Sequence, residues 1–440
     1  MRRLIPFLPA TLVALALIIA LSGPPPYAQE GGGKGPVVLE VTGAKRDLYK
    51  IAVPRLVGDA QLGPGVADVV SFDLTMSGWF KVLDPRSFLA QLEAEGLGLN
   101  LGDWRNVGAE GVSKGKVTAT GDQLSLDFKL YEIGRGDKAV LERTYRGTRA
   151  DLRRMAHSWS AELVRYYANE DSFFQSRIAF SASMGPGRKE ILTMDYDGAG
   201  VSRVTENGSQ NILPAWSPSG GQIAFTSFLR GNPDLYLVSA AGGRAKRISD
   251  RPGVNMGASF APDGSKLAVT LSQDGNPEIY LIGLDGSIIR RLTDNPFIDS
   301  SAAFSPDGGQ IAFVSNRHGS PQIWTMSSSG AGQNRLTRKG NYNQEPSWCP
   351  RCPQPTLAFT GRDERANFDG FTMNVQTGEI VRLTEGQGSN QHPTWAPNGR
   401  ALAMASTRGG IWITTADGKT QRQVYRGSAE VPTWGASLRR

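Results

Sequence analysis

The sequence has two cysteines, Cys349 and Cys352, which lie in the motif WCPRCP. This motif stands where the chain elsewhere has a tight turn such as SPDG, as in FSPDGGQIAFVS (304–315). The first and fourth residues of a β-turn lie within about 7 Å, which overlaps the span of a disulfide. Because the chain begins like an exported protein, we predict a local disulfide. A redox-active pair is an alternative that lacks a thioredoxin-like setting, and zinc would need two further ligands.

A second candidate is GVSKG (111–115), which matches the G-x-S-x-G motif of serine hydrolases. That motif requires a strand, a sharp elbow and a helix, with Asp and His later in a hydrolase domain. Here the motif continues directly into a predicted strand at 116–120, and we expect no hydrolase domain after it. A chance match is the favoured interpretation, so we predict no catalytic residue.

Polar side chains recur at one position of a repeat that fills the last two-thirds of the chain. The position five residues before the closing aromatic residue of each repeat holds Asn211, Asn255, Asp299, Asn343 and Asn390. The sixth repeat has Ala429 there, followed by Glu430. We expect these residues to surround one mouth of a central channel as a polar rim for a ligand or another protein. The alternative is that they only form turns, as Asn and Asp often do.

Connections at the same mouth carry further polar and basic side chains. They are Arg230, Asn316, Arg317, His318 and Arg408, and His392 lies on the same side. A metal or a quinone would need acidic or histidine ligands that converge in the channel, whereas the predicted rim is mostly amide. We therefore predict no cofactor and no metal.

The repeat itself predicts the architecture. Its closing aromatic residues are Trp216, Phe260, Phe304, Trp348, Trp395 and Trp434. Their successive spacings are 44, 44, 44, 47 and 39 residues, and each interval holds short apolar runs separated by turn residues. A period of about 40 to 45 residues with four short strands is typical of a β-propeller blade. Six repeats therefore predict an all-β propeller with six blades.

The order of the strands predicts how the ring closes. The chain enters the repeats at a second strand (178–180) and leaves at a first strand (431–435), so the last strand should complete the first blade and hide its sheet edges. Four first strands contain a proline, which suits an edge strand, so we expect them to line the channel. The middle residue of every second strand is Ala, which suits a face closely covered by the next blade.

Three further parts precede the propeller, which we place at 173–440. Residues 1–28 combine Arg2 and Arg3 with an apolar run and small residues, which is the pattern of a secretory signal peptide. Residues 29–48 form a Gly-rich flexible segment, and residues 49–172 alternate predicted strands with helices at 66–78, 87–96 and 151–169, as in a small α/β domain.

Composition excludes two classes of partner. The net charge of +7 is mild and dispersed, so it does not indicate nucleic acid. No stretch after the leader is long and apolar enough to span a membrane, so we expect no direct membrane insertion.

Several phrases of the chain carry a resemblance to a known family. They are IAVP (51–54), DYDG (195–198), ILPAWSPSGGQIAFTS (212–227) and SSAAFSPDGGQIAFVS (300–315). Together with the order of leader, α/β domain and six repeats, they resemble the TolB family, the periplasmic propellers of the Tol–Pal system. The resemblance covers essentially the whole chain after the leader.

The resemblance implies a non-enzymatic periplasmic scaffold that binds other proteins. One propeller mouth would dock the lipoprotein Pal, and the N-terminal segment would bind TolA, in support of outer-membrane integrity and constriction at cell division. Other outer-membrane lipoproteins are further candidate partners, and we expect a monomer. The alternatives are an exported propeller enzyme, either a hydrolase or a sugar dehydrogenase, and another ligand-binding propeller.

The implied sites fall on two sets of residues. The Pal-binding face comprises Asn211, Val254, Asn255, Asp299, Val314, Asn316, Arg317, His318, Asn343, Asn390, His392 and Glu430. The TolA-binding segment comprises Val37, Val38, Leu39, Glu40, Val41 and Thr42. Val41 and Lys45 stand where the family usually has acidic residues.

Overall fold

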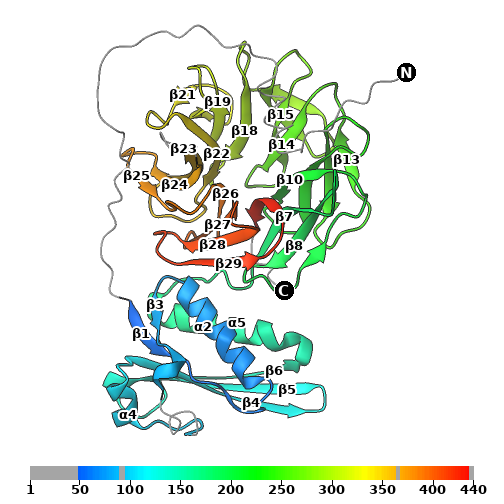
Figure 1. Cartoon of the computed structure of the whole chain (residues 1–440). Coiled ribbons are helices and arrows are strands. Elements are labelled where there is room, and N and C mark those ends of the chain that lie inside the picture. The colour runs from blue at the N-terminus through cyan, green and yellow to red at the C-terminus, as the bar shows by residue number, and fades with distance from the viewer. Residues whose placement is uncertain (1–47, 89–94, 363–366, 436–440) are drawn as a thin grey trace. The chain divides into compact units, whose positions relative to one another are not determined.

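The structure is a computed structural model that describes residues 48–88, 95–362 and 367–435. The predicted signal peptide and the predicted TolA-binding segment lie outside the described residues. The described chain forms two compact units (Figure 1), and each is considered by itself. One unit comprises residues 48–175 with 414–420, and the other comprises residues 176–413 with 421–435.

The first unit contains a mixed sheet in the order β3-β1-β4-β5-β6, with β2 paired to β4. Its strands are β1 (Tyr49–Ala52), β2 (Val57–Gly58), β3 (Phe80–Val82), β4 (Gly111–Thr120), β5 (Gln123–Glu132) and β6 (Leu141–Thr148). β4, β5 and β6 form the predicted antiparallel meander. β1 runs parallel to both β3 and β4. The unit is therefore the small α/β domain that the sequence predicts.

Helices α2 (Gly63–Met76) and α5 (Leu152–Ala168) pack against each other in this unit. Met155, Trp159 and Leu163 of α5 are buried as predicted, whereas Tyr166 is 38 % exposed. The helix ends at Asn169, which adopts a left-handed conformation with φ of 53°. A buried pair joins the two helices, because Asp73 Oδ2 lies 2.9 Å from His157 Nδ1.

Short helices complete this unit. They are α4 (Leu101–Asn106) and the 3₁₀ helices η1 (Pro85–Ser87), η2 (Ile133–Arg135) and η3 (Arg149–Asp151). The sequence did not predict α4. Most of the helix predicted at 87–96 lies outside the described residues.

The second unit is a propeller of six four-stranded antiparallel sheets (Figure 1). Blade 1 consists of β30 (Ala429–Trp434), β7 (Arg177–Ser183), β8 (Lys189–Asp195) and β9 (Ser202–Arg203). Blade 2 consists of β10 (Asn211–Trp216), β11 (Gln222–Ser227), β12 (Asp234–Ser239) and β13 (Lys246–Ser249). Blade 3 consists of β14 (Asn255–Phe260), β15 (Lys266–Leu271), β16 (Glu278–Gly283) and β17 (Ile288–Arg291).

The remaining blades follow the same order from the inside of the ring outward. Blade 4 consists of β18 (Asp299–Phe304), β19 (Gln310–Ser315), β20 (Gln322–Ser327) and β21 (Asn334–Arg335). Blade 5 consists of β22 (Tyr342–Trp348), β23 (Thr356–Arg362), β24 (Asp369–Asn374) and β25 (Ile380–Arg382). Blade 6 consists of β26 (Asn390–Trp395), β27 (Ala401–Ser406), β28 (Ile411–Thr415) and β29 (Gln421–Tyr425).

The ring closes as the sequence predicts. The C-terminal strand β30 pairs with β7 at the beginning of the repeats, so that Trp434 lies opposite Ile178 and Thr433 opposite Ala179. Trp434 Nε1 also donates a hydrogen bond of 2.7 Å to Ser176 Oγ. This pairing covers an edge of β7 that would otherwise be free to bind another strand.

Small residues and tryptophans join successive blades. The middle alanines of the second strands have no exposed surface: Ala179, Ala224, Ala268, Ala312, Ala358 and Ala403. Ala312 of blade 4 packs in one cluster with Trp348 and Leu357 of blade 5. Trp348 Nε1 in turn donates to the Ala303 carbonyl of blade 4 at 3.1 Å. The prediction of a closely covered sheet face is confirmed, because a larger side chain would hold the sheets apart.

Within the described residues, no helix is long and apolar enough to cross a membrane.

Candidate protein-binding face

Antiparallel pairing brings two sets of connections to the same end of the propeller. In blade 3, for example, Asn255 begins the first strand, Leu271 ends the second and Glu278 begins the third, and the three lie side by side. The connections between second and third strands therefore lie beside the links that lead from one blade to the next. We call this surface the link end. The turns between first and second strands lie at the opposite surface, the turn end.

The Asn and Asp residues that were predicted to form an exposed rim are buried at the link end. Asn211, Asn255, Asp299 and Asn390 have no exposed surface, and Asn343 is 3 % exposed. The prediction of an exposed amide rim is therefore wrong.

Asn255 shows what such a residue does instead. Its amide nitrogen donates to the carbonyls of Arg251 and Gly253, at 2.7 and 3.2 Å. Its amide oxygen accepts from Ser249 Oγ at 2.5 Å and from the Arg251 backbone nitrogen at 3.1 Å. A short amide can satisfy both donors and acceptors of the buried link backbone, which would otherwise lack partners.

Five blades share a buried polar cluster of which these residues are one member. An acidic or amide residue is the first or second residue of the third strand, a Thr or Ser follows fifteen positions later, and the Asn or Asp follows six positions after that. The clusters are Glu190–Thr205–Asn211, Asp234–Ser249–Asn255, Glu278–Thr293–Asp299, Gln322–Thr337–Asn343 and Asp369–Thr384–Asn390. This constant spacing is a signal in the sequence that an inspection of the Asn positions alone does not reveal.

Two of the clusters have the same contacts. Thr205 Oγ1 and Asn211 Nδ2 both donate to Glu190 Oε2, at 2.5 and 2.8 Å. Thr337 Oγ1 and Asn343 Nδ2 donate in the same way to Gln322 Oε1, at 2.8 and 2.9 Å. These two clusters therefore fix their links to the third strand of the preceding blade.

Blade 6 joins its link differently. Gly410 precedes its third strand with φ of +68°, and a Cβ there would lie 1.8 Å from the Tyr425 carbonyl oxygen. Direct contact between backbones thus replaces the polar cluster at the point where the ring closes.

Arg317 and His318 both lie on the connection of blade 4. Arg317 Nη2 donates to Asp299 Oδ2 at 2.5 Å, and its guanidinium lies 5.0 Å from the centre of the Trp324 ring. The His318 ring stacks on Trp324 with a centroid distance of 5.4 Å. Arg317 is only 17 % exposed, whereas His318 is exposed. Of the two side chains, His318 is therefore the one that is exposed to solvent.

Three other predicted residues differ in exposure. Val314 is 6 % exposed and packs into the core, so its side chain does not form part of the surface. Asn316 is half-buried, and its Oδ1 accepts from the Ile298 backbone nitrogen at 2.8 Å. Val254 is half-buried at the link end.

The six innermost strands line a channel of about 320 Å³. Each strand has a bulge at which one residue adopts a left-handed conformation: Leu213, Gly257, Ser301, Glu345, His392 and Val431, with φ between 51° and 65°. The residue after this position is Pro214, Ala258, Ala302, Pro346, Pro393 or Pro432. The bulges turn these residues toward the channel, and they confirm that the proline-bearing strands are innermost.

Two of the bulge residues form an ion pair in the channel wall. His392 Nε2 lies 2.9 Å from Glu345 Oε1, and Glu345 Oε2 accepts from Thr360 Oγ1 at 2.6 Å and from the His392 backbone nitrogen at 2.8 Å. Burial by itself raises the pKa of the Glu345 carboxyl, but the charge of His392 and these hydrogen bonds outweigh it and hold the pKa below its ordinary value. His392 thus joins blades 5 and 6 and does not lie free at the mouth.

Glu430 has a similar role at the closure of the ring. Its Oε1 lies 2.6 Å from Lys189 Nζ, and the two side chains are 27 % and 14 % exposed. The pair links the innermost and third strands of blade 1.

The link end also presents two large apolar side chains that sequence reasoning missed. Leu229, on the connection after β11, is 49 % exposed, and Phe297, on the link before β18, is 41 % exposed. Burying such side chains favours association by about 1.5 to 3 kcal/mol each when they become fully buried. Periodicity did not reveal them because they lie in connections and not in strands.

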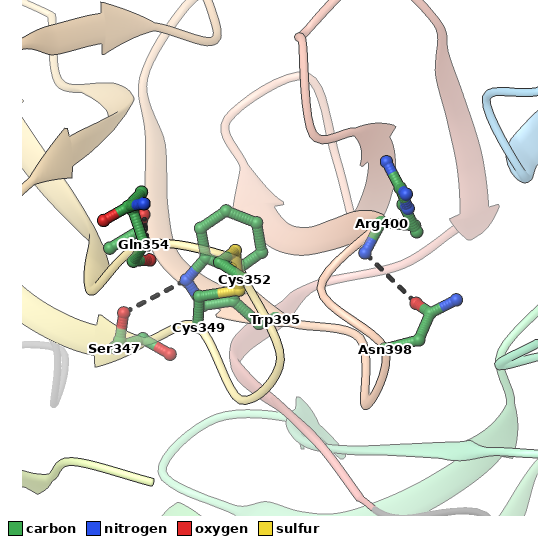
Figure 2. Close-up of a disulfide and its surroundings, with 8 residues drawn as sticks. Ser347, Cys349, Cys352, Gln354, Trp395, Asn398 and Arg400 are labelled. Carbon is green, nitrogen blue, oxygen red and sulfur yellow. Dashed lines mark hydrogen bonds between the residues drawn. A yellow bond between two sulfur atoms is a disulfide. The ribbon is translucent and has the colours of Figure 1, made fainter. Parts of the chain in front are cut away.

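The cysteines form the predicted disulfide, which lies at the turn end of blade 5 (Figure 2). The predicted tight turn is replaced by a longer connection, since the Cys349 nitrogen donates to the Thr356 carbonyl seven residues on. Trp395 of blade 6 lies beside the disulfide and donates from Nε1 to the Ser347 carbonyl at 3.1 Å.

The serine of GVSKG does not form a nucleophile elbow. Ser113 lies within β4, is buried, and accepts a hydrogen bond of 2.8 Å from Trp159 Nε1. Among the described residues, no group of three or more His, Cys, Asp or Glu side chains could hold a metal ion.

A six-bladed propeller that follows a small α/β domain in the chain defines the class of this protein. Family models agree with both parts. Residues 37–139 match the TolB amino-terminal domain, and residues 166–438 match the TolB beta propeller domain. The chain belongs to the TolB family.

Relatives and solved structures agree with this assignment. The chain is 39% identical over 219 residues to the Tol-Pal system protein TolB of Geobacter sulfurreducens, and the alignment covers 49% of each chain. It is 40% identical over 192 residues to the protein of the same name from Anaeromyxobacter dehalogenans, and this alignment covers 42% of this chain and 44% of the relative. These alignments span about half the length of the curated relatives.

The similarity to a solved structure extends further. The crystal structure of TolB from Acinetobacter baumannii has a TM-score of 0.76 and 26% sequence identity, and the match covers 90% of this chain and 98% of that chain. The α/β domain and the propeller therefore occur together in a TolB of known structure.

Proposed function

We propose that the protein is a non-enzymatic scaffold of the Tol–Pal system in the periplasm. In this proposal its link end docks Pal, residues 37–42 bind TolA, and the protein acts as a monomer that supports outer-membrane integrity and constriction at cell division. The observation that carries the proposal is the match of both domains, in order, to the TolB family. Other outer-membrane lipoproteins would use the same surface.

The geometry of the link end supports its use as a docking surface. The buried polar clusters hold the links in place, so a partner that binds there meets an ordered surface and orders few loops on binding. Leu229, Phe297 and His318 are exposed on this end and supply apolar and aromatic contact area. Binding energy at protein interfaces is concentrated in a few such side chains.

Measured binding to purified Pal tests the docking surface. We expect Leu229→Ser and Phe297→Ser each to weaken the affinity by about tenfold, which corresponds to about 1.4 kcal/mol. Ile289→Ser is the matched control, because Ile289 is 55 % exposed but lies on the outermost strand β17 of blade 3. Unchanged affinity in both link-end variants would place the Pal site elsewhere.

Deletion of residues 35–46 tests the TolA part of the proposal. The deletion should abolish binding to purified TolA and leave the affinity for Pal within about twofold, since Pal docks on the propeller in this proposal. Retained TolA binding after the deletion would contradict the assignment of the segment.

The absence of an enzymatic activity is part of the same proposal. Ser113 is supported by Trp159 inside a strand, which is a structural role for the one residue that matched a hydrolase motif. Purified protein that hydrolysed ester or peptide substrates, with loss of activity in Ser113→Ala, would favour the exported enzyme instead.

A further inference from the structure

The disulfide of blade 5 occurs at a connection that other blades build without cysteine. In blades 2, 3, 4 and 6, the turn between first and second strands contains a backbone hydrogen bond that a glycine nitrogen donates to the carbonyl three residues earlier. These glycines are Gly220, Gly264, Gly308 and Gly399, with φ between 71° and 74°. The fold therefore does not require a covalent bridge at this position.

The ring that the disulfide closes is also very small. Cys349 and Cys352 are three residues apart, and the stabilisation expected from restricting the unfolded chain grows with loop length. A bridge of this span therefore contributes less to folding than one that joins distant segments. A purely stabilising role leaves the choice of two cysteines unexplained.

The two cysteine residues differ in exposure. Cys349 is 5 % exposed, and its backbone nitrogen is held by Thr356, whereas Cys352 is half-buried in the bend. Arg351 is exposed and precedes Cys352 directly. A neighbouring cation lowers the pKa of a thiol and so favours the thiolate that leaves or attacks in exchange.

The disulfide also lies against the next blade. A Cβ built on Gly399 of blade 6 would lie 2.7 Å from Cys349 Sγ and 3.3 Å from Cys352 Sγ. Figure 2 shows Trp395, from the same blade, beside the sulfur atoms. Two separate thiols need more room than a bonded pair, so reduction must change the contact between blades 5 and 6.

We propose that Cys349–Cys352 is a site of thiol–disulfide exchange with a dithiol protein of the exported compartment. A thiolate of the dithiol partner attacks Cys352 Sγ, a mixed disulfide forms, and Cys349 leaves as the thiolate and takes up a proton. The second thiolate of the partner then attacks the partner sulfur that is bonded to Cys352 in the mixed disulfide, and Cys352 leaves as a thiolate that takes up a proton. The partner loses two electrons and becomes a disulfide, and this chain gains them as two thiols.

Reduction of the folded protein tests the site. Oxidised protein is incubated with reduced thioredoxin as the dithiol probe, and free thiols are counted by alkylation and mass measurement while circular dichroism follows the fold. We expect both thiols to appear while the propeller stays folded. Reduction that occurs only at denaturant concentrations that unfold the protein would show a structural bridge and overturn the proposal.

Single-cysteine variants identify the attacked sulfur. Cys349→Ser leaves Cys352 and should form a mixed disulfide with oxidised glutathione at least about tenfold faster than Cys352→Ser, in which the buried Cys349 remains. Equal rates, or a faster reaction of Cys349, would contradict the assignment.

Arg351 variants test the role of the neighbouring charge. In the Cys349→Ser variant, Arg351→Gln should raise the pH at which Cys352 becomes reactive, and Arg351→Lys should return that pH to its value with Arg351. A pH profile that is the same in all three proteins would show that Arg351 does not act on the thiol.

Discussion

Asn255 and its counterparts show that a polar residue near a channel can serve the fold instead of a ligand. The amides of Asn255 and Asn343 donate to backbone carbonyls of their links. Asn343 also shares Gln322 with Thr337, and Asn255 accepts from Ser249. Replacing such a residue would leave buried groups without partners, at a cost of about 1 to 3 kcal/mol for each group. A binding defect in an Asn255 variant would therefore not by itself locate a partner.

At the residue scale, Glu345 is expected to make stability depend on pH. Its pKa is lowered in the folded protein from the ordinary value of 4.5, so its contribution is present above that value and is lost as the pH falls through the lower, folded pKa. Glu345→Gln should cost about 1 to 3 kcal/mol at neutral pH and less in acid. Urea unfolding at several pH values measures the difference.

Glu206→Gln is the control for this prediction, because the Glu206 side chain is 81 % exposed and should contribute little. If the stability of Glu345→Gln falls in acid as steeply as that of the unaltered protein, the pair with His392 does not carry the effect.

At the element scale, the innermost strands combine a bulge with a left-handed residue in every blade. Non-glycine residues rarely adopt this conformation, so the surrounding sheet must hold it in place. The strand regains its pairing on the other side of the bulge, as between Ile212 and Ala215 in β10. The bulge is thus a property of the element and not of any one side chain.

The close backbone contact between Gly410 and Tyr425 in blade 6 gives a prediction at the same scale. Gly410→Ala should destabilise the protein by at least about 3 kcal/mol, because its Cβ would meet the Tyr425 carbonyl and because the left-handed conformation costs about 1 to 2 kcal/mol. Gly409→Ala is the matched control, since it also has positive φ but its Cβ would meet only Gln423 Nε2, at 3.9 Å. Thermal unfolding compares them, and equal losses would argue against the steric effect.

At the scale of the whole molecule, stability depends on the pairing of the C-terminal strand β30 with β7, the first strand of the propeller in the sequence. A chain that ends at Gly427 lacks β30 and leaves β7 with an unpaired edge. We expect a loss of more than about 4 kcal/mol and aggregation, measured by calorimetry and light scattering.

Two comparisons make this prediction specific. A synthetic peptide of residues 427–440, added in excess, should restore the folded ring. Trp434→Phe keeps the strand but removes the hydrogen bond to Ser176, so it should cost only about 1 kcal/mol. A truncated chain that unfolds like the complete one would show that closure contributes little.

Much of this architecture follows from local patterns. The period of the repeat predicted six blades, the phase of the first and last strands predicted closure, and prolines predicted which strands are innermost. These features depend on residues a few positions apart. The exposure of the Asn positions was predicted wrongly because it depends on how the links fold against neighbouring strands. Asn211 and Asn343, for example, donate to third-strand residues that lie 21 positions earlier in the chain.

The sequence by itself thus determined the number of blades, the way the ring closes, the α/β domain and the pairing of Cys349 with Cys352. Only the tertiary structure decided that the Asn and Asp residues at the link end are buried. It also decided that Glu345 and His392 pair in the channel wall and that Leu229 and Phe297 stay exposed. The physical reason is that turn and strand preferences act along the chain, whereas burial is set by segments that fold against one another.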